Sequence, residues 1–260
     1  MEEQANPQFS PLPPPVQDNT SVWSRYFNVL ASPSEAFEGI ASLEKKTVLW
    51  IVPMIILIIA TIGIAALTMS NPAVQQDVQA TIEKKMQNNV QSGAMTQQQA
   101  DQAIEMGTKM SKVWAYFGAV FGVPIFWLVV TLVYWLVLSF ILGGEISFLN
   151  TFTVYSLGSA VYLIEALITG LLVYATGSLM TQLNLGFLVS AENNAMMHAL
   201  LARFNPFTFW LLWVLCIGFV KVSNLTMKKT VYGVAGLWLA YSAAAVLLSN
   251  IPMFKSMSGM

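Results

Sequence analysis

One carboxylate, Glu165, is the only charged residue in the apolar stretch 146–191. If this stretch is helical, Tyr162 lies three positions before Glu165 and Thr169 four positions after it, so the three side chains share a face. Ser159, six positions before the acid, falls on much the same side. The spacing therefore predicts a stripe of small and polar side chains that includes Glu165.

Glu165 has two candidate roles, because ionisable residues inside a membrane are costly and commonly functional. It could handle protons or ions, or it could make structural hydrogen bonds. The structural role is favoured, because a single acid with no intramembrane partner makes a poor relay, and no lysine or arginine lies in the core of another apolar run. We expect Glu165 to be protonated, hydrogen-bonded to Tyr162 and a hydroxyl of another helix, or in contact with water. The stripe should face other helices rather than lipid.

Other chemistry has little support in the sequence. The chain holds one histidine, His198, and one cysteine, Cys216, so a Cys/His metal cluster and an internal disulfide are both excluded. Neither of the glycine-rich phosphate-binding motifs is present. The net charge of −1 gives no electrostatic basis for binding nucleic acid. We therefore expect no catalytic residues, no metal and no cofactor.

The composition places the chain in a membrane. Apolar residues make up 56% and charged residues 10% of the 260 residues, whereas soluble domains carry about 25% charged residues. A spanning helix needs about 20 apolar residues, because lipid offers the backbone no hydrogen-bond partner. We predict an all-α, polytopic transmembrane helical bundle over 48–252, with Pro124 as a kink in the second span. The five predicted spans are 48–69, 113–142, 151–175, 205–222 and 230–251.

Polar segments flank this membrane domain. Residues 1–19 are proline-rich and are predicted to form a disordered tail, and 253–260 form a second, short tail. Residues 20–47 hold two short helices, which we expect at the membrane interface with their aromatic face at headgroup level. That face comprises Trp23, Tyr26, Phe27 and Leu30.

Two short helices outside the spans carry capping signals. Ser32 with Glu35 predicts a capping box, and Pro33 stands at the first helical position. Ser190 is expected to cap an amphipathic helix that lies on the membrane within the long connection 176–204.

A longer extramembrane feature is expected in the glutamine-rich insertion 70–112. It reads as a helical hairpin of 73–91 and 97–112 that continues into the second span. Thr96 with Gln99 predicts a capping box at the start of its second helix.

The orientation follows from lysine and arginine positions. Each side of the membrane receives six such residues, so the raw count gives no preference. The pairs Lys45–Lys46 and Lys228–Lys229 stand directly at the ends of spans and favour an N-terminus inside.

Three segments carry a resemblance to a known family: SPSEAFEGI at 32–40, GGEISFLNTFTVYSLGSA at 143–160 and RFNPFTFWLLWVLCIGF at 203–219. With the five-span spacing, they resemble the Yip family of Ypt/Rab-interacting membrane proteins over about 21–252. The insertion 70–112 is similar to that of bacterial members. The motif residues are Pro33, Phe37, Gly144, Asn205, Pro206, Phe207, Trp210 and Gly218.

The residues of the fourth-span motif also have a structural explanation. Asn205 can cap the helix and Pro206 suits its first position. Phe207 and Trp210 can anchor the interfacial end of the span. No ligand is needed to explain this pattern.

The resemblance implies a five-span domain with a cytosolic N-terminus, and for a bacterial member the cytoplasmic (inner) membrane. Eukaryotic relatives act in vesicle budding and fusion and bind prenylated small GTPases or one another. The leading interpretation is a non-enzymatic protein that contacts the lipid bilayer and binds protein partners or a second copy of itself. The alternative is a small-solute or ion transporter or channel, with the Glu165 stripe lining its path.

Overall fold

The computed structural model describes residues 20–43, 46–190 and 193–248. These residues form helices and no strands, and five helices are long and apolar enough to span a membrane. The predicted all-α, five-span bundle is therefore confirmed. The tails predicted at 1–19 and 253–260 lie outside the described residues. The spans run Thr47–Ser70, Val113–Ile141, Phe148–Thr176, Pro206–Ser223 and Met227–Leu248.

The helical elements follow one another with short connections, apart from the segment after α8. The first half of the chain contains α1 (Val22–Ala31), α2 (Pro33–Ala36), η1 (Ile40–Ser42), α3 (Thr47–Ser70), α4 (Pro72–Gln91), α5 (Gln97–Phe117), η2 (Gly118–Gly122) and α6 (Val123–Leu136). The second half contains η3 (Val137–Ile141), α7 (Phe148–Gly158), α8 (Ala160–Thr176), η4 (Leu185–Leu188), α9 (Ala195–Leu201), α10 (Pro206–Ser223) and α11 (Met227–Leu248).

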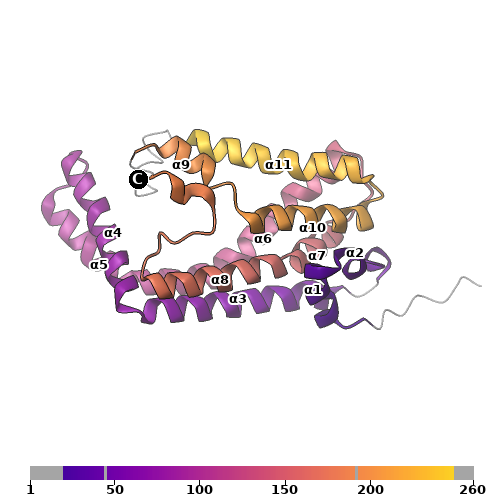
Figure 1. Ribbon diagram of the computed structural model, residues 1–260, viewed down its shortest axis with the longest axis horizontal. Helices are drawn as coiled ribbons and strands as arrows, with labels where there is room; N and C mark the ends of the chain where they lie inside the picture. The colour runs from indigo at the N-terminus through magenta and orange to yellow at the C-terminus, as the bar shows by residue number, and fades with distance from the viewer. Residues whose placement is uncertain (1–19, 44–45, 191–192, 249–260) are drawn as a thin grey trace, which may run out of the picture.

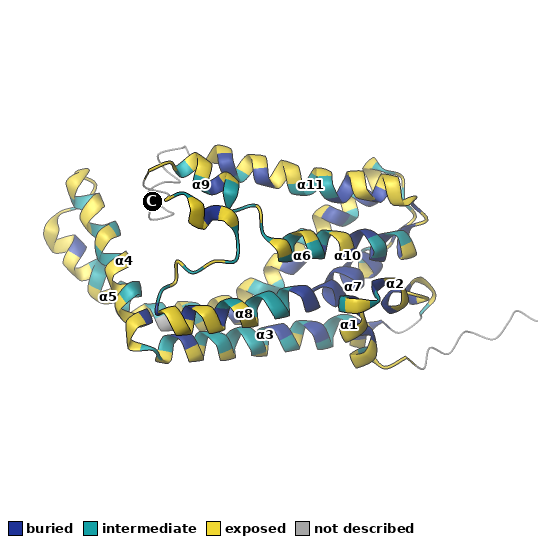
Figure 2. Cartoon of the chain, in the orientation of Figure 1, coloured by how far each residue is buried: buried dark blue, intermediate teal, exposed yellow. Residues whose placement is uncertain are grey.

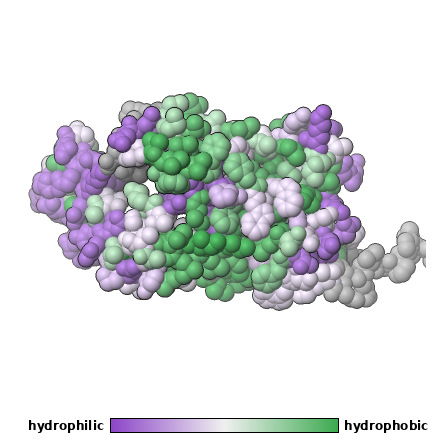
Figure 3. Space-filling model, viewed as in Figure 1, coloured by the Kyte–Doolittle hydropathy of each residue, from purple (hydrophilic) through white to green (hydrophobic). Residues whose placement is uncertain are grey.

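The spans form a bundle whose core lies toward one end. α3 and α8 run side by side along one edge, and α10 and α11 pair along the other (Figure 1). α7 contacts α3, α6 and α10, and all its residues from Asn150 to Gly158 are buried, which makes it the dark blue centre of Figure 2. The other end of the bundle is more exposed, with the apolar surface that a spanning protein turns to lipid (Figures 2 and 3).

The N-terminal helices pack onto this core. Tyr26 and Phe37 are fully buried in it, whereas Trp23 and Phe27 are exposed. The prediction that Tyr26 lies at headgroup level is therefore wrong, because its ring buries more apolar surface against the protein than it would at an interface. Burial also raises the pKa of the Tyr26 phenol, which keeps it neutral.

The capping box predicted for α2 is not formed. Ser32 and Pro33 occupy the expected N-cap and first positions, but the Ser32 side chain makes no capping hydrogen bond. The reason is that Ser32 also ends α1: its backbone N–H donates to the Asn28 carbonyl at 2.7 Å. A residue that serves two helices at once has a backbone conformation set by both, and here its hydroxyl is not aimed at the N–H of Glu35.

α4 and α5 form an antiparallel hairpin that projects beyond the bundle (Figure 1). Thr96 caps α5 in a complete capping box with Gln99, as predicted. Gly93 makes the turn at φ 74°, a left-handed conformation that costs glycine little. The inner face is closely packed, since a Cβ on Gly107 would lie 3.3 Å from the Ile82 side chain.

α5 continues into the second span without a break. The π-helical turn η2 lies directly before Pro124, which stands in the first turn of α6. A π turn accommodates a residue that cannot donate to the carbonyl four positions earlier. The predicted irregularity at Pro124 therefore takes the form of a widened turn.

The connection after α8 holds η4 and the short helix α9. The predicted amphipathic helix is present, but its cap is Asn194, whose Oδ1 accepts from the Met197 N–H at 2.9 Å. The expectation of Ser190 as the cap is wrong, because the helix begins four residues later. Met196 and Leu200 are exposed while Ala199 is buried, so an apolar surface on this connection faces outward.

Candidate functional site

The centre of the candidate site is a contact between Glu165 of α8 and Asn205 at the start of α10. The Asn205 carboxamide serves both helices. Its Oδ1 accepts from the Phe207 N–H at 2.8 Å and so caps α10, while its Nδ2 donates to the Glu165 carboxylate oxygen Oε1. Asn205 and Pro206 thus fix where α10 begins, and the same cap ties α10 to the middle of α8.

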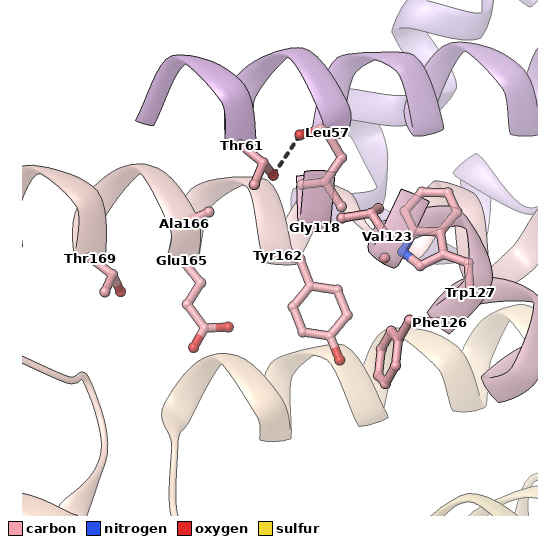
Figure 4. Close-up of a pocket in the computed structure, with 11 residues that line it drawn as sticks. Leu57, Thr61, Gly118, Val123, Phe126, Trp127, Tyr162, Glu165, Ala166 and Thr169 are labelled. Carbon is pink, nitrogen blue, oxygen red and sulfur yellow. Dashed lines mark hydrogen bonds between the residues drawn. The ribbon is translucent and has the colours of Figure 1, made fainter. Parts of the chain in front are cut away.

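Glu165 also lines a cavity of about 550 Å³ between α3, α8 and the η2–α6 region. Tyr162 and Thr169 line it from the same helix, and Thr61 lines it from α3. In Figure 4 the Glu165 carboxylate, the Tyr162 ring and Thr169 all point to the same side of α8. The predicted polar stripe therefore meets both a cavity and the beginning of a neighbouring helix.

A second cavity, of about 620 Å³, lies between α6, α10 and α11. Tyr162 and Phe126 line both cavities, so their side chains stand where the two spaces adjoin. Asn205 and Arg203 line the second cavity. The Glu165–Asn205 contact thus lies beside this boundary, with the acid on one side and the amide on the other.

The structure brings only part of the predicted stripe to this site. Ser159 is fully buried at the junction of α7 and α8, where its hydroxyl donates to the Ser156 carbonyl at 2.6 Å. Of the alternatives expected for Glu165, a hydrogen bond to a hydroxyl of another helix is not the one observed: the partner from α10 is the Asn205 amide. Spacing could not reveal Asn205 as the partner, because the two residues are 40 positions apart.

The residues of the family motif lie on the packed side of the bundle or at helix starts. Phe37 packs against the backbone of α10 at Gly218, and Gly144 follows η3 in close contact with Leu225. Pro33 and Pro206 are first residues of α2 and α10. The rings of Phe207 and Trp210 contact each other in a tilted arrangement, with centroids 6.3 Å apart. Each of these positions has a clear structural role in packing or capping.

Within the described residues, no group of three or more His, Cys, Asp or Glu side chains could hold a metal ion. The Nδ1 atom of His198 lies 2.8 Å from the Val189 carbonyl oxygen, which ties α9 to the segment after η4. Cys216 is buried within α10. The Glu165 site can accept and donate hydrogen bonds, but it brings no nucleophile and base together.

These features define a class: a polytopic, all-α integral membrane protein with a polar contact between two of its spans. The chain belongs to the Yip family, because the family model of the Yip1 domain matches residues 27–248. No curated protein and no solved structure matches the chain.

The Glu165–Asn205 contact can be tested by a double-mutant cycle. Asn205→Ser keeps a side-chain oxygen that can cap α10 but removes the amide donor, and Glu165→Ala removes the acceptor. We expect each single variant to lower the free energy of unfolding in detergent by about 1 kcal/mol. The double variant should be no less stable than the less stable of the two single variants. Strictly additive losses would show that the two side chains do not interact.

Proposed function

We propose that this Yip-family chain is a non-enzymatic membrane protein that binds another membrane protein through the α4–α5 hairpin. One observation carries the proposal: the outer face of α5 exposes a row of large apolar side chains. The part of this row that precedes the second span, at Met106 and Met110, lies outside the bilayer, where exposed apolar side chains indicate an interaction surface.

The row, which we call the α5 stripe, follows helical spacing from the hairpin to the membrane. Its members share one face of the helix and are at least one-third exposed. They are Met106, Met110, Val113, Trp114 and Phe117. The neighbouring face of α5 packs inside the hairpin, where Ala100 is fully buried and Gly107 lies close to Ile82.

A helix of a partner membrane protein fits the α5 stripe best. The stripe runs unbroken from a polar hairpin into an apolar span, so its occupant must be apolar along a line that crosses the membrane boundary. Methionine and tryptophan are residues that adapt to and anchor such contacts. Beside the stripe, Glu105 and Lys109 form an ion pair with each other at 2.6 Å. The partner therefore needs no charged side chain to neutralise either of them.

The membrane and orientation are part of the proposal. We place the protein in a bacterial cytoplasmic (inner) membrane with its N-terminus in the cytoplasm, supported by the lysine pairs at the ends of the first and fifth spans. The spans alternate, so the hairpin and the α9 connection then lie on the opposite side. Labelling of single cysteines placed at Asp101 and Lys229 with a membrane-impermeant reagent tests this directly.

The partner-binding function is tested by photocrosslinking in native membranes. A benzophenone side chain at Met106 should give one discrete crosslinked product with a second protein, whereas the same probe at Asp101, exposed on another face of α5, should give none. Trp114→Gln should weaken the association by about 2 kcal/mol, as expected for a tryptophan at the centre of an interface. Trp213→Gln, which alters an equally exposed tryptophan on α10, should leave the crosslink unchanged. Equal labelling at both probe positions would contradict the proposal.

A transport function is the second candidate, because the Glu165 stripe lines a cavity that adjoins a second one at Tyr162. A path through the bundle would use these side chains as its polar lining. Solute or proton flux in liposomes that is abolished by Glu165→Gln, in a variant with an unchanged melting temperature, would favour transport over partner binding.

A further inference from the structure

The cavity between α6, α10 and α11 contains polar groups that the Glu165 contact does not use. We propose that this cavity is a binding site for one anionic phospholipid, with the phosphate on Arg203 and an acyl chain in the cavity. The site is separate from the α5 stripe and goes beyond the proposed function.

The depth of Arg203 in the membrane is the first argument. The third span has 29 residues and would extend roughly 44 Å, which is longer than a hydrocarbon core of about 30 Å. α10 has 18 residues, about 27 Å, and matches that core. Arg203 stands just before α10, and at the other end Lys221 pairs with Glu38. The guanidinium of Arg203 is therefore placed at the boundary where lipid phosphates lie.

The bonding of Arg203 is the second argument. Its Nη1 donates to the Tyr241 hydroxyl at 3.3 Å, its Nε donates to the Ala199 carbonyl at 3.4 Å, and the guanidinium lies 5.4 Å from the centre of the Tyr241 ring. Among the described residues, no carboxylate pairs with it. A guanidinium offers five donors in a fork that matches phosphate geometry, so donors remain for an anion.

The lining of the cavity is the third argument. Tyr155 and Tyr162, whose hydroxyl groups interact with each other, line the cavity from α7 and α8, and the Tyr155 side chain is 2% exposed. These two hydroxyl groups add polar atoms to a lining that is otherwise largely apolar. Below Arg203 the walls are apolar, with Leu211 and Leu212 on α10 and Leu237 on α11.

The cavity is also accessible from the lipid side. Phe126, Val129 and Val133 line it from α6 and are themselves 42–55% exposed on the surface of the bundle. Figure 3 shows hydrophilic residues between the apolar lobes of the molecule. A lipid could therefore enter sideways between α6 and α11, with its chain along α10 and its headgroup at the polar rim.

The experiment measures lipid retention by the full-length protein in detergent with native mass spectrometry. The probes are phosphatidylglycerol and phosphatidylcholine with the same acyl chains, and glycerol phosphate, which has the anion without chains. We expect one retained phosphatidylglycerol and a preference of about tenfold over phosphatidylcholine. Arg203 can donate a charge-assisted hydrogen bond to the phosphate of phosphatidylglycerol, whereas the phosphate of phosphatidylcholine is already paired with the cation of its own headgroup. Glycerol phosphate should not displace the lipid.

Variants separate the headgroup contact from the chain contact. Arg203→Gln should remove the preference for phosphatidylglycerol, whereas Lys228→Gln, at an exposed cation on α11, should preserve it. Ala240→Trp, which fills the cavity from an exposed position, should lower the retention of both lipids. A wild-type preference that survives Arg203→Gln, or displacement by glycerol phosphate, would overturn the proposal.

A second measurement needs no variant and so does not depend on the folding of one. Phosphatidylglycerol with a photoactivatable group in its acyl chain should label wild-type peptides from α6 and α11 that contain Phe126–Tyr134 and Leu237–Tyr241. Labelling confined to other helices would overturn the proposal.

Discussion

Replacing Gly218 with valine is expected to lower the free energy of unfolding by about 3 kcal/mol or more, enough to prevent recovery of folded protein from detergent. A Cβ at this position would lie 2.5 Å from Val154 Cγ1 and 3.0 Å from Phe37 Cε2. Neither neighbour can move away easily, because Val154 and Phe37 are both fully buried. Gly218 thus lets α10 approach α7 and the end of α2 at the same point.

The matched control is Gly236→Val on α11. A Cβ there meets nothing within 4 Å, and Gly236 is exposed, so the same change of side chain should be neutral or slightly stabilising in a helix. Thermal unfolding followed by size-exclusion chromatography compares the two variants. Similar melting temperatures for both would mean that α7 and α10 do not pack as closely as described.

Replacing Arg25 with methionine is expected to release α1 from α2. Arg25 is 4% exposed, and its Nη1 donates to the carbonyls of Ala36 and Glu38 at 2.6 and 2.9 Å. Hydrogen bonds from a charged donor contribute about 1.5–3 kcal/mol each. Methionine keeps the apolar stem but leaves both carbonyls without this donor, so we expect a loss of about 3 kcal/mol in the packing of α1 against α2.

Limited proteolysis in detergent measures this release. Arg25→Met should expose cleavage sites between residues 20 and 46 while the five spans stay protected. Arg25→Lys, which keeps the charge but has no guanidinium fork, should fall between the variant and the wild type. Lys229→Gln, at an exposed cation on α11, should be as resistant as the wild type. Protection of the N-terminal region in Arg25→Met would assign the docking to Tyr26 and Phe37 alone.

Sequence signals predicted the structure correctly where the interactions involve only neighbouring residues in the chain. The five spans could be predicted because a bilayer demands about 20 consecutive apolar residues whatever the neighbouring helices do. The Thr96 box and the Asn205 cap formed as expected because a cap involves only the next three residues. The Ser32 box did not form because Ser32 also ends the preceding helix. Ser190 does not cap α9, because that helix begins later, at Asn194.

The candidate site divides in the same way. Helical periodicity brought Glu165, Tyr162 and Thr169 to one face, and the cavity they line is consistent with that. It also grouped Ser159 with them, although the junction of α7 and α8 turns that hydroxyl back to its own backbone. The partner Asn205 belongs to another helix, and no spacing within one helix encodes which helix will stand opposite.

The amino-acid sequence by itself therefore determined that the chain lies in a lipid bilayer and how many times it spans it. It also determined where the main helices start and that one of them carries a polar stripe. The tertiary structure alone decided which faces meet: Tyr26 enters the core instead of the interface, Arg25 joins α1 to α2, and Arg203 reaches the rim of a cavity. The physical reason is that the cost of burying backbone and charge in lipid acts on each segment separately. Side-chain packing, in contrast, depends on pairs of helices far apart in the chain.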